Sequence, residues 1–218
     1  AYAGQFNWKV ALGVCFGSWL TLLTLADLVQ KANLRRRGMR GVGRLSRSYW
    51  GMVLGHLGMA VAVFGVTLTS QFSVERDLSL VPGESVGVGD YQFTLQQVKA
   101  VNGPNYKADR GFVIVEREQQ VVTTLYPEKR RYAASDQVMT EAGIDAGLFR
   151  DLYVSLGEPL SDGAWAVRVQ VKPFVRWLWL GSLLVALGGV VAVTDPRYRR
   201  TVLGRSRQTA ATLAAEAG

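Results

Sequence analysis

The stretch WGMVLGHLGMAVAVFG, residues 50–65, places the only histidine of the chain, His56, inside a long apolar run. The run extends from about Tyr49 to Thr69, and roughly 20 apolar residues are enough to cross a bilayer as a helix. A histidine at that depth can form an interhelical hydrogen bond, carry a proton, or bind a metal or haem iron. Neighbouring segments narrow the choice among these roles.

Two further apolar runs resemble this one in length and composition. They occupy about residues 8–28 and 177–194. A chain in lipid must satisfy its backbone hydrogen bonds internally, so each run is expected to be a helix in spite of its glycines. We therefore predict transmembrane helices within residues 1–28, 49–70 and 177–194.

The net charge of +8 is concentrated in two short segments beside these runs. Residues 29–48 carry +7 and residues 195–218 carry +3, whereas residues 71–176 carry −2. Arginine excess marks the cytoplasmic side of a membrane protein. The pattern predicts a cytoplasmic loop at 29–48, a cytoplasmic tail at 195–218 and a periplasmic domain at 71–176. It also argues against a nucleic-acid partner, because the basic charge belongs to the membrane flanks.

The segment 71–176 is rich in short β-type runs separated by Gly, Pro and Asp turns. Such spacing predicts an all-β extramembrane domain, either a small antiparallel barrel, possibly of the oligonucleotide-binding type, or a sandwich. Residues 135–147 fit either a short helix or a loop. The expected hairpins pair residues 86–88 with 91–101, 111–117 with 121–127, and 150–156 with 164–173.

The β domain offers little chemistry of its own. It contains neither histidine nor cysteine, so the usual metal and nucleophile constellations are absent and its catalytic residues are unknown. A basic cluster, PEKRRY at 127–132, could meet an acidic partner or a propionate, or form an ordinary solvated turn. The chain begins AYAGQFNW, without Met or a charged leader, and we interpret it as a fragment of a larger membrane protein or a mature product.

Small residues on the His56 helix suggest a helix partner. They recur at alternating spacings of four and three, which lets another helix approach closely, and we expect a bulky residue at Gly55 to push that helix away. His56 is accordingly expected to face a helix bundle, which leaves a hydrogen-bonding role and a ligand or proton role both open. The members of this stripe are Gly51, Gly55, Gly58, Ala62 and Gly65.

Several long motifs resemble the C-terminal part of one family. They are YWGMVLGHLGMAV, VNGPNYKADRGFVIVER, LYPEKRRY, TEAGIDAGLFRDLYVSLG, DGAWAVRVQVKPFVRWLWLG and ALGGVVAVTDPRYRR. Together they are similar to CcmF, the haem lyase subunit of the machinery that matures c-type cytochromes. The resemblance runs in order from the second apolar run to about Arg200.

The resemblance implies a function for the complete protein. It would lie in the bacterial inner membrane, receive haem from a periplasmic haem chaperone, and promote thioether attachment of that haem to apocytochrome c. Thiol-handling and apocytochrome-presenting maturation proteins would be further partners. The family's histidine at the position of His56 is one axial ligand of a transmembrane b haem.

The other haem ligands of the family lie in an N-terminal portion that this chain lacks. The resemblance therefore implies that this part is inactive alone and needs the rest of the same protein. Two other interpretations remain: a membrane-anchored β-domain scaffold with a structural His56, and a transporter subunit in which His56 carries protons.

Overall fold

The computed structural model describes residues 7–32, 39–43, 45–134 and 137–197. Contacts divide the chain into two compact units, residues 1–67 with 177–218, and residues 68–176. Much of the two predicted basic segments, namely residues 33–38, 44 and 198–218, lies outside the described residues.

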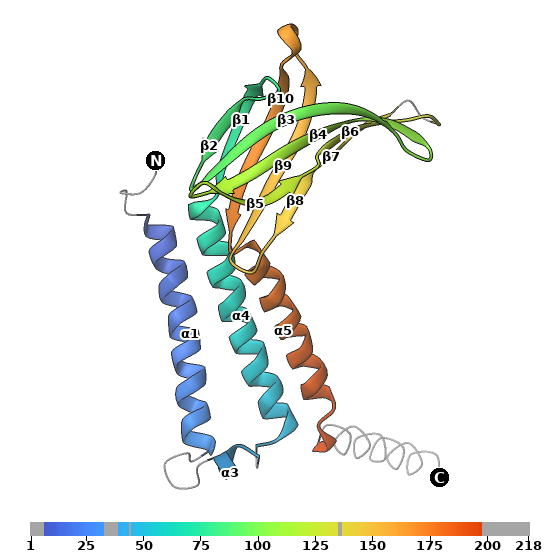
Figure 1. Ribbon diagram of the computed structural model, residues 1–218. Helices are drawn as coiled ribbons and strands as arrows, with labels where there is room; N and C mark the ends of the chain where they lie inside the picture. The colour runs from blue at the N-terminus through green and yellow to red at the C-terminus, as the bar shows by residue number, and fades with distance from the viewer. Residues whose placement is uncertain (1–6, 33–38, 44, 135–136, 198–218) are drawn as a thin grey trace, which may run out of the picture. The chain divides into compact units, whose positions relative to one another are not determined.

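Long apolar helices make up the first unit (Figure 1). They are α1 (Trp8–Ala32), α4 (Arg47–Phe72) and α5 (Val175–Val193), with a short α3 (Met39–Val42) between the first two. Among the described residues, these three long helices are long and apolar enough to cross a membrane. The three predicted membrane helices are confirmed as helices, each beginning or ending within a few residues of the expected position.

Helix α4 packs closely on α5 through glycines spaced seven residues apart. A Cβ atom added at Gly51 would lie 2.5 Å from the Gly188 carbonyl oxygen, and one added at Gly58 would lie 2.7 Å from the Gly181 carbonyl oxygen. A Cβ atom at Gly55 would meet nothing within 4 Å. The predicted small-residue stripe is thus correct in kind, but the expectation that a bulky residue at Gly55 would push the partner helix away is wrong, because its Cβ would point into open space.

Asp195, two residues beyond α5, joins the end of that helix to the start of α4. Its carboxylate accepts hydrogen bonds from the backbone N–H of Arg197 at 3.0 Å and of Ser48 at 2.8 Å. These two bonds hold the pKa of Asp195 below its usual range. A carboxylate at a helix N-terminus also interacts favourably with the helix dipole, so Asp195 caps α4 from 147 residues away.

The second unit contains two antiparallel sheets, among the residues that the structure describes (Figure 1). One sheet has the spatial order β1 (Val74–Leu80), β10 (Trp165–Pro173), β9 (Arg150–Pro159) and β8 (Gly143–Ala146). The other has the order β2 (Ser85–Val88), β3 (Tyr91–Asn102), β4 (Tyr106–Arg117), β6 (Glu128–Tyr132) and β7 (Val138–Glu141), and β5 (Gln120–Leu125) also pairs with β4.

Alternating apolar residues from both sheets form the core of this unit. On β3, Phe93 and Leu95 are fully buried, and on β9, Leu152, Val154 and Leu156 are fully buried. Their spacing of two places them on one face of each strand. Because the two sheets pack face to face through these residues, the domain is a β-sandwich, which is the second of the two predicted architectures.

The predicted hairpins are all observed, and one uncertain segment is resolved. Strands β2 and β3, β4 and β5, and β9 and β10 pair antiparallel as expected. Residues 135–147, expected to be a helix or a loop, instead supply β7 to one sheet and β8 to the other. Gly143 begins β8, where an added Cβ atom would lie 2.9 Å from the Tyr126 backbone nitrogen. A side chain at this position would clash with the Tyr126 backbone, so the position requires glycine.

A buried carboxylate stabilises the second sheet. Glu128 is only 4% exposed and accepts a hydrogen bond from Arg130 Nε at 2.6 Å and another from Arg110. Burial by itself raises the pKa of Glu128, but the hydrogen bonds from Arg130 and Arg110 outweigh it and hold the pKa below its usual range. The carboxylate is therefore charged in the folded domain at neutral pH.

Replacement of Glu128 by glutamine is expected to lower the free energy of unfolding by about 1–3 kcal/mol, because Arg110 and Arg130 lose a charged acceptor that is itself buried. A lowered pKa stabilises the fold fully above the unfolded value, about 4.3, and this stabilisation is lost as pH falls through the folded pKa. Chemical denaturation between pH 7 and pH 3 measures both effects. Glu158→Gln, which alters an exposed ion pair, is the control and should change stability by less than about 0.5 kcal/mol.

Candidate functional site

His56 lies in an apolar groove between α1 and α4. The groove has a volume of about 250 Å³. Its polar lining is limited to Thr24, Asp27 and His56, and the rest is aliphatic, aromatic or thioether surface. The full lining consists of Trp19, Leu20, Leu23, Thr24, Asp27, Met52 and His56.

The His56 ring is held in one tautomer by the backbone of its own helix. Its Nδ1 lies 2.8 Å from the Met52 carbonyl oxygen. A carbonyl oxygen can only accept a hydrogen bond, so in the neutral imidazole Nδ1 carries the proton and Nε2 keeps its lone pair. A hydrogen bond from one ring nitrogen to a backbone carbonyl is the arrangement that orients metal-binding histidines and raises their basicity.

His56 faces away from the glycine contacts with α5. A helix advances about 100° per residue, so His56 lies roughly 160° from Gly58 around α4. The side of α4 that carries His56 instead meets α1, where a Cβ atom at Gly17 would lie 3.0 Å from the Phe64 ring. His56 remains exposed within the described residues, so its groove is open on one side. The structure thus offers an accessible imidazole with a free Nε2 in apolar surroundings.

Asp27 is a groove residue that the sequence analysis overlooked. Its carboxylate accepts a hydrogen bond from the Tyr49 hydroxyl at 2.6 Å and lies 3.7 Å from Lys31 Nζ. Lys31 also lies over the Tyr49 ring, 4.6 Å from its centroid. The sequence does indicate this residue, because a carboxylate within a membrane-length helix costs free energy and commonly has a function.

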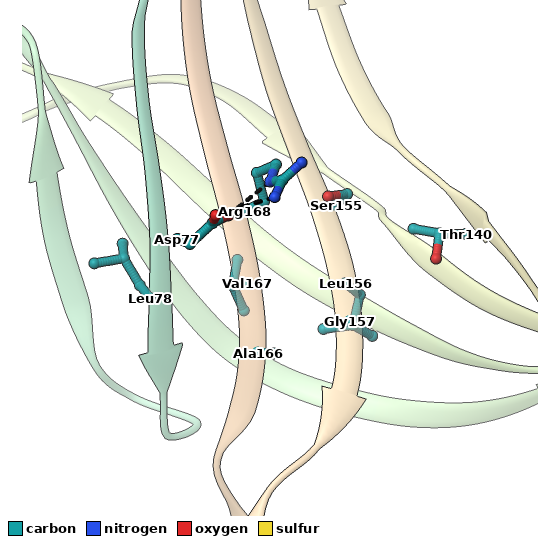
Figure 2. A pocket seen from close by; sticks show the side chains of 9 residues that line it. All are labelled: Asp77, Leu78, Thr140, Ser155, Leu156, Gly157, Ala166, Val167 and Arg168. Carbon is teal, nitrogen blue, oxygen red and sulfur yellow. Dashed lines mark hydrogen bonds and ion pairs between the residues drawn. The ribbon is translucent and has the colours of Figure 1, made fainter.

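The β-sandwich has hollows on its surface. One of them, drawn in Figure 2, has a volume of about 320 Å³ and contains Arg168, which donates two hydrogen bonds to Asp77 at 2.6 and 3.0 Å. The Arg168 guanidinium thus already has the exposed Asp77 carboxylate as its hydrogen-bond partner. Within the described ranges, no group of three or more His, Cys, Asp or Glu side chains could hold a metal ion.

The predicted basic cluster at 127–132 lies on β6 and lines a second hollow of about 380 Å³. Two of its cations, Lys129 and Arg130, have acidic partners within the domain. Lys129 Nζ lies 2.6 Å from Glu158 Oε1, and Arg130 Nη1 lies 3.4 Å from Glu141 Oε1. The cluster is therefore part of the packing of the β domain, and it is not the solvated turn that was its ordinary alternative.

The fold and the groove together define a membrane protein with a β-sandwich inserted in the chain between two membrane-length helices. Residues 71–173 match the family described as CcmF C-terminal beta-sandwich. The chain belongs to the CcmF family of cytochrome c-type biogenesis proteins, as the sequence motifs indicated.

Relatives support this assignment along most of the chain. Cytochrome c-type biogenesis protein CcmF of Pseudomonas aeruginosa is 50% identical over 95% of this chain and 31% of its own length. The Escherichia coli protein of the same name is 44% identical over 88% of this chain and 28% of its own length. The chain thus spans about 30% of the length of these relatives.

A solved structure shares the fold. It is the protein titled Cytochrome c Heme Lyase CcmF, which superposes with a TM-score of 0.61 at 17% identity, over 89% of this chain and 36% of that chain. At this identity the likeness supports the fold alone.

Proposed function

We propose that this chain is the haem-ligating C-terminal part of a cytochrome c haem lyase. The family membership supports the general role in cytochrome c biogenesis. The observation that carries the finer proposal is the His56 tautomer, because the 2.8 Å contact with the Met52 carbonyl leaves Nε2 free for iron. His56 would be one axial ligand of a b haem held between membrane helices.

The groove residues fit a haem. Trp19, Leu20 and Leu23 would provide apolar surface for a porphyrin. The Met52 carbonyl fixes the imidazole plane. A haem bound there supplies one-electron redox chemistry, whose potential depends on axial ligation and burial. His56 is the only histidine of the chain, so a second histidine ligand would come from the remainder of the full-length protein.

The substrates and partners follow from the same proposal. The full-length protein would receive haem from a periplasmic chaperone and join its vinyl groups to the cysteine thiols of apocytochrome c. Thiol-handling and apocytochrome-presenting proteins would deliver that substrate with its cysteines reduced. No residue of the β-sandwich is assigned a chemical role in this step.

Absorption spectroscopy of the purified full-length protein tests the proposal. A haem lyase with a b haem at His56 should show a Soret band and a pyridine haemochrome of the b type, and should support holocytochrome c production in a maturation-deficient strain. Stable protein without either spectral signature would favour the scaffold interpretation, in which His56 only bonds within its helix. Full restoration of proton-coupled transport without haem would favour the transporter interpretation.

The sidedness of the membrane is a separate prediction. The charges of +7 on residues 29–48 and +3 on residues 195–218 predict that these segments lie in the cytoplasm and that the β domain lies in the periplasm. Alkaline phosphatase fused within residues 71–176 should therefore be active, and the same enzyme fused after Arg207 should be inactive. The opposite pattern would reverse the assignment of sides.

A further inference from the structure

The loop that joins β8 to β9 exposes two large apolar side chains. Leu148 is 56% exposed and Phe149 is 59% exposed. Single apolar residues on a surface are ordinary. Two adjacent apolar residues that include an aromatic ring can contact lipid if they lie at the surface of a membrane.

Phe174 fixes the position of this loop. The Phe174 backbone N–H donates a hydrogen bond to the Phe149 carbonyl oxygen at 2.9 Å, and the two rings meet edge to face with centroids 6.2 Å apart. Phe174 immediately precedes Val175, the first residue of the membrane-length helix α5. The loop therefore lies beside the residue that directly precedes α5.

The last turn of α4 contacts the segment that precedes α5. Thr69, in the last turn of α4, donates its hydroxyl to the Pro173 carbonyl oxygen at 2.8 Å. The last turn of α4 and the first residue of α5 thus both lie next to Pro173 and Phe174, and Phe174 holds the Phe149 backbone. Because both helices are long enough to span the hydrocarbon core, their shared end marks the membrane–water interface.

Several contacts hold this junction in place. Phe174 adopts a φ of 58°, a left-handed conformation that is unfavourable for a bulky side chain and persists only where the surroundings impose it. The hydrogen bond to Phe149 is one such constraint. A second is the contact of Arg176 Nε with Asp151 Oδ1 at 3.5 Å, which ties the start of α5 to β9.

We propose that the loop of residues 147–149 inserts Leu148 and Phe149 into the bilayer interface on the side of the β domain. Aromatic side chains concentrate at the headgroup level of membrane proteins, and the loop is held at that level by Phe174. Arg176, half exposed at the same junction, can meet lipid phosphates. The partner is thus lipid, and the proposal depends on α5 spanning the bilayer but not on haem binding.

The accessibility of a spin label to oxygen and to a water-soluble nickel chelate tests whether the loop lies in lipid. A nitroxide attached at Leu148→Cys, in full-length protein with its other cysteines replaced and reconstituted in phosphatidylcholine–phosphatidylglycerol nanodiscs, should be more accessible to oxygen than to a water-soluble nickel chelate. Leu160→Cys is the matched control. It replaces an exposed leucine at the far end of β9, roughly 30 Å away along the ten-residue strand, and should show the reverse accessibility.

Two outcomes would overturn the proposal. Equal nickel accessibility at the two positions would place the loop in water, and a label at 148 that neither reagent reaches would mean that protein covers it. If the cysteine variants do not fold, Phe149→Trp offers a second measurement. Brominated lipid should quench this variant more than the unmodified protein, and no additional quenching would contradict lipid contact.

Discussion

Replacement of His56 by alanine in the full-length protein is expected to remove most of its b haem. Alanine supplies neither a donor atom for iron nor the volume of the imidazole, and no other lining residue of the groove has a nitrogen lone pair that could bind iron. The measurement is haem per folded protein, from the pyridine haemochrome of monodisperse material. A structural histidine predicts a different result, because losing one polar contact costs at most a few kcal/mol and haem would fall only in proportion to the protein.

Chemical rescue distinguishes ligation from packing. His56→Gly supplied with imidazole should recover part of the lost haem, because the free ring can occupy the vacated space and bind iron. Met52→Leu is the matched control. This variant keeps the backbone carbonyl that orients His56 Nδ1 and removes only the neighbouring thioether, so its haem content should stay near that of the unmodified protein. An unchanged haem ratio in His56→Ala, with holocytochrome c still produced, would refute the ligand assignment.

The membrane helices and the core hairpins were predictable because their signals are local. An apolar run of bilayer length has few alternatives in a chain that must satisfy its own backbone. Likewise, alternation such as Phe93 and Leu95 on β3 specifies one buried face whatever strand lies opposite. These features depend on spacing within a short window, so they are visible before any tertiary contact is known.

Strands β7 and β8 were missed because their pairing is not local. Each is four residues long, too short to show a period. They are strands because β7 pairs with β6 in one sheet and β8 pairs with β9 in the other. Gly143 permits the crossing by its close approach to Tyr126, and a glycine in the sequence does not reveal which backbone it approaches.

The candidate site shows the same limit. The sequence identified His56 because a lone imidazole in an apolar run is conspicuous, yet it could not identify the tautomer, which depends on the 2.8 Å contact with Met52. Nor could it associate Asp27 with His56, since the two lie on helices α1 and α4 and share a groove only after packing. The ligand assignment itself stays a prediction, supported by family and tautomer together.

Substitution of leucine for Gly58 should disrupt the packing of α4 on α5. A Cβ atom at Gly58 would lie 2.7 Å from the Gly181 carbonyl oxygen and 2.8 Å from Val185 N. Both atoms belong to backbone and cannot move without displacing α5. Overpacking of a well-packed interior costs typically 1–3 kcal/mol and occasionally more, and because backbone atoms block the new side chain, we expect a cost at or above the upper end, about 3 kcal/mol.

Gly55→Leu provides the matched control for this variant, since it adds the same side chain one turn away where a Cβ atom meets nothing within 4 Å. The yield of monodisperse protein and the midpoint of thermal unfolding should fall clearly for Gly58→Leu and stay near the unmodified values for Gly55→Leu. Haem content should follow the same order, because His56 depends on α4 being folded in place. Equal behaviour of the two variants, or greater damage at Gly55, would show that the seven-residue glycine spacing does not form the α4–α5 contact.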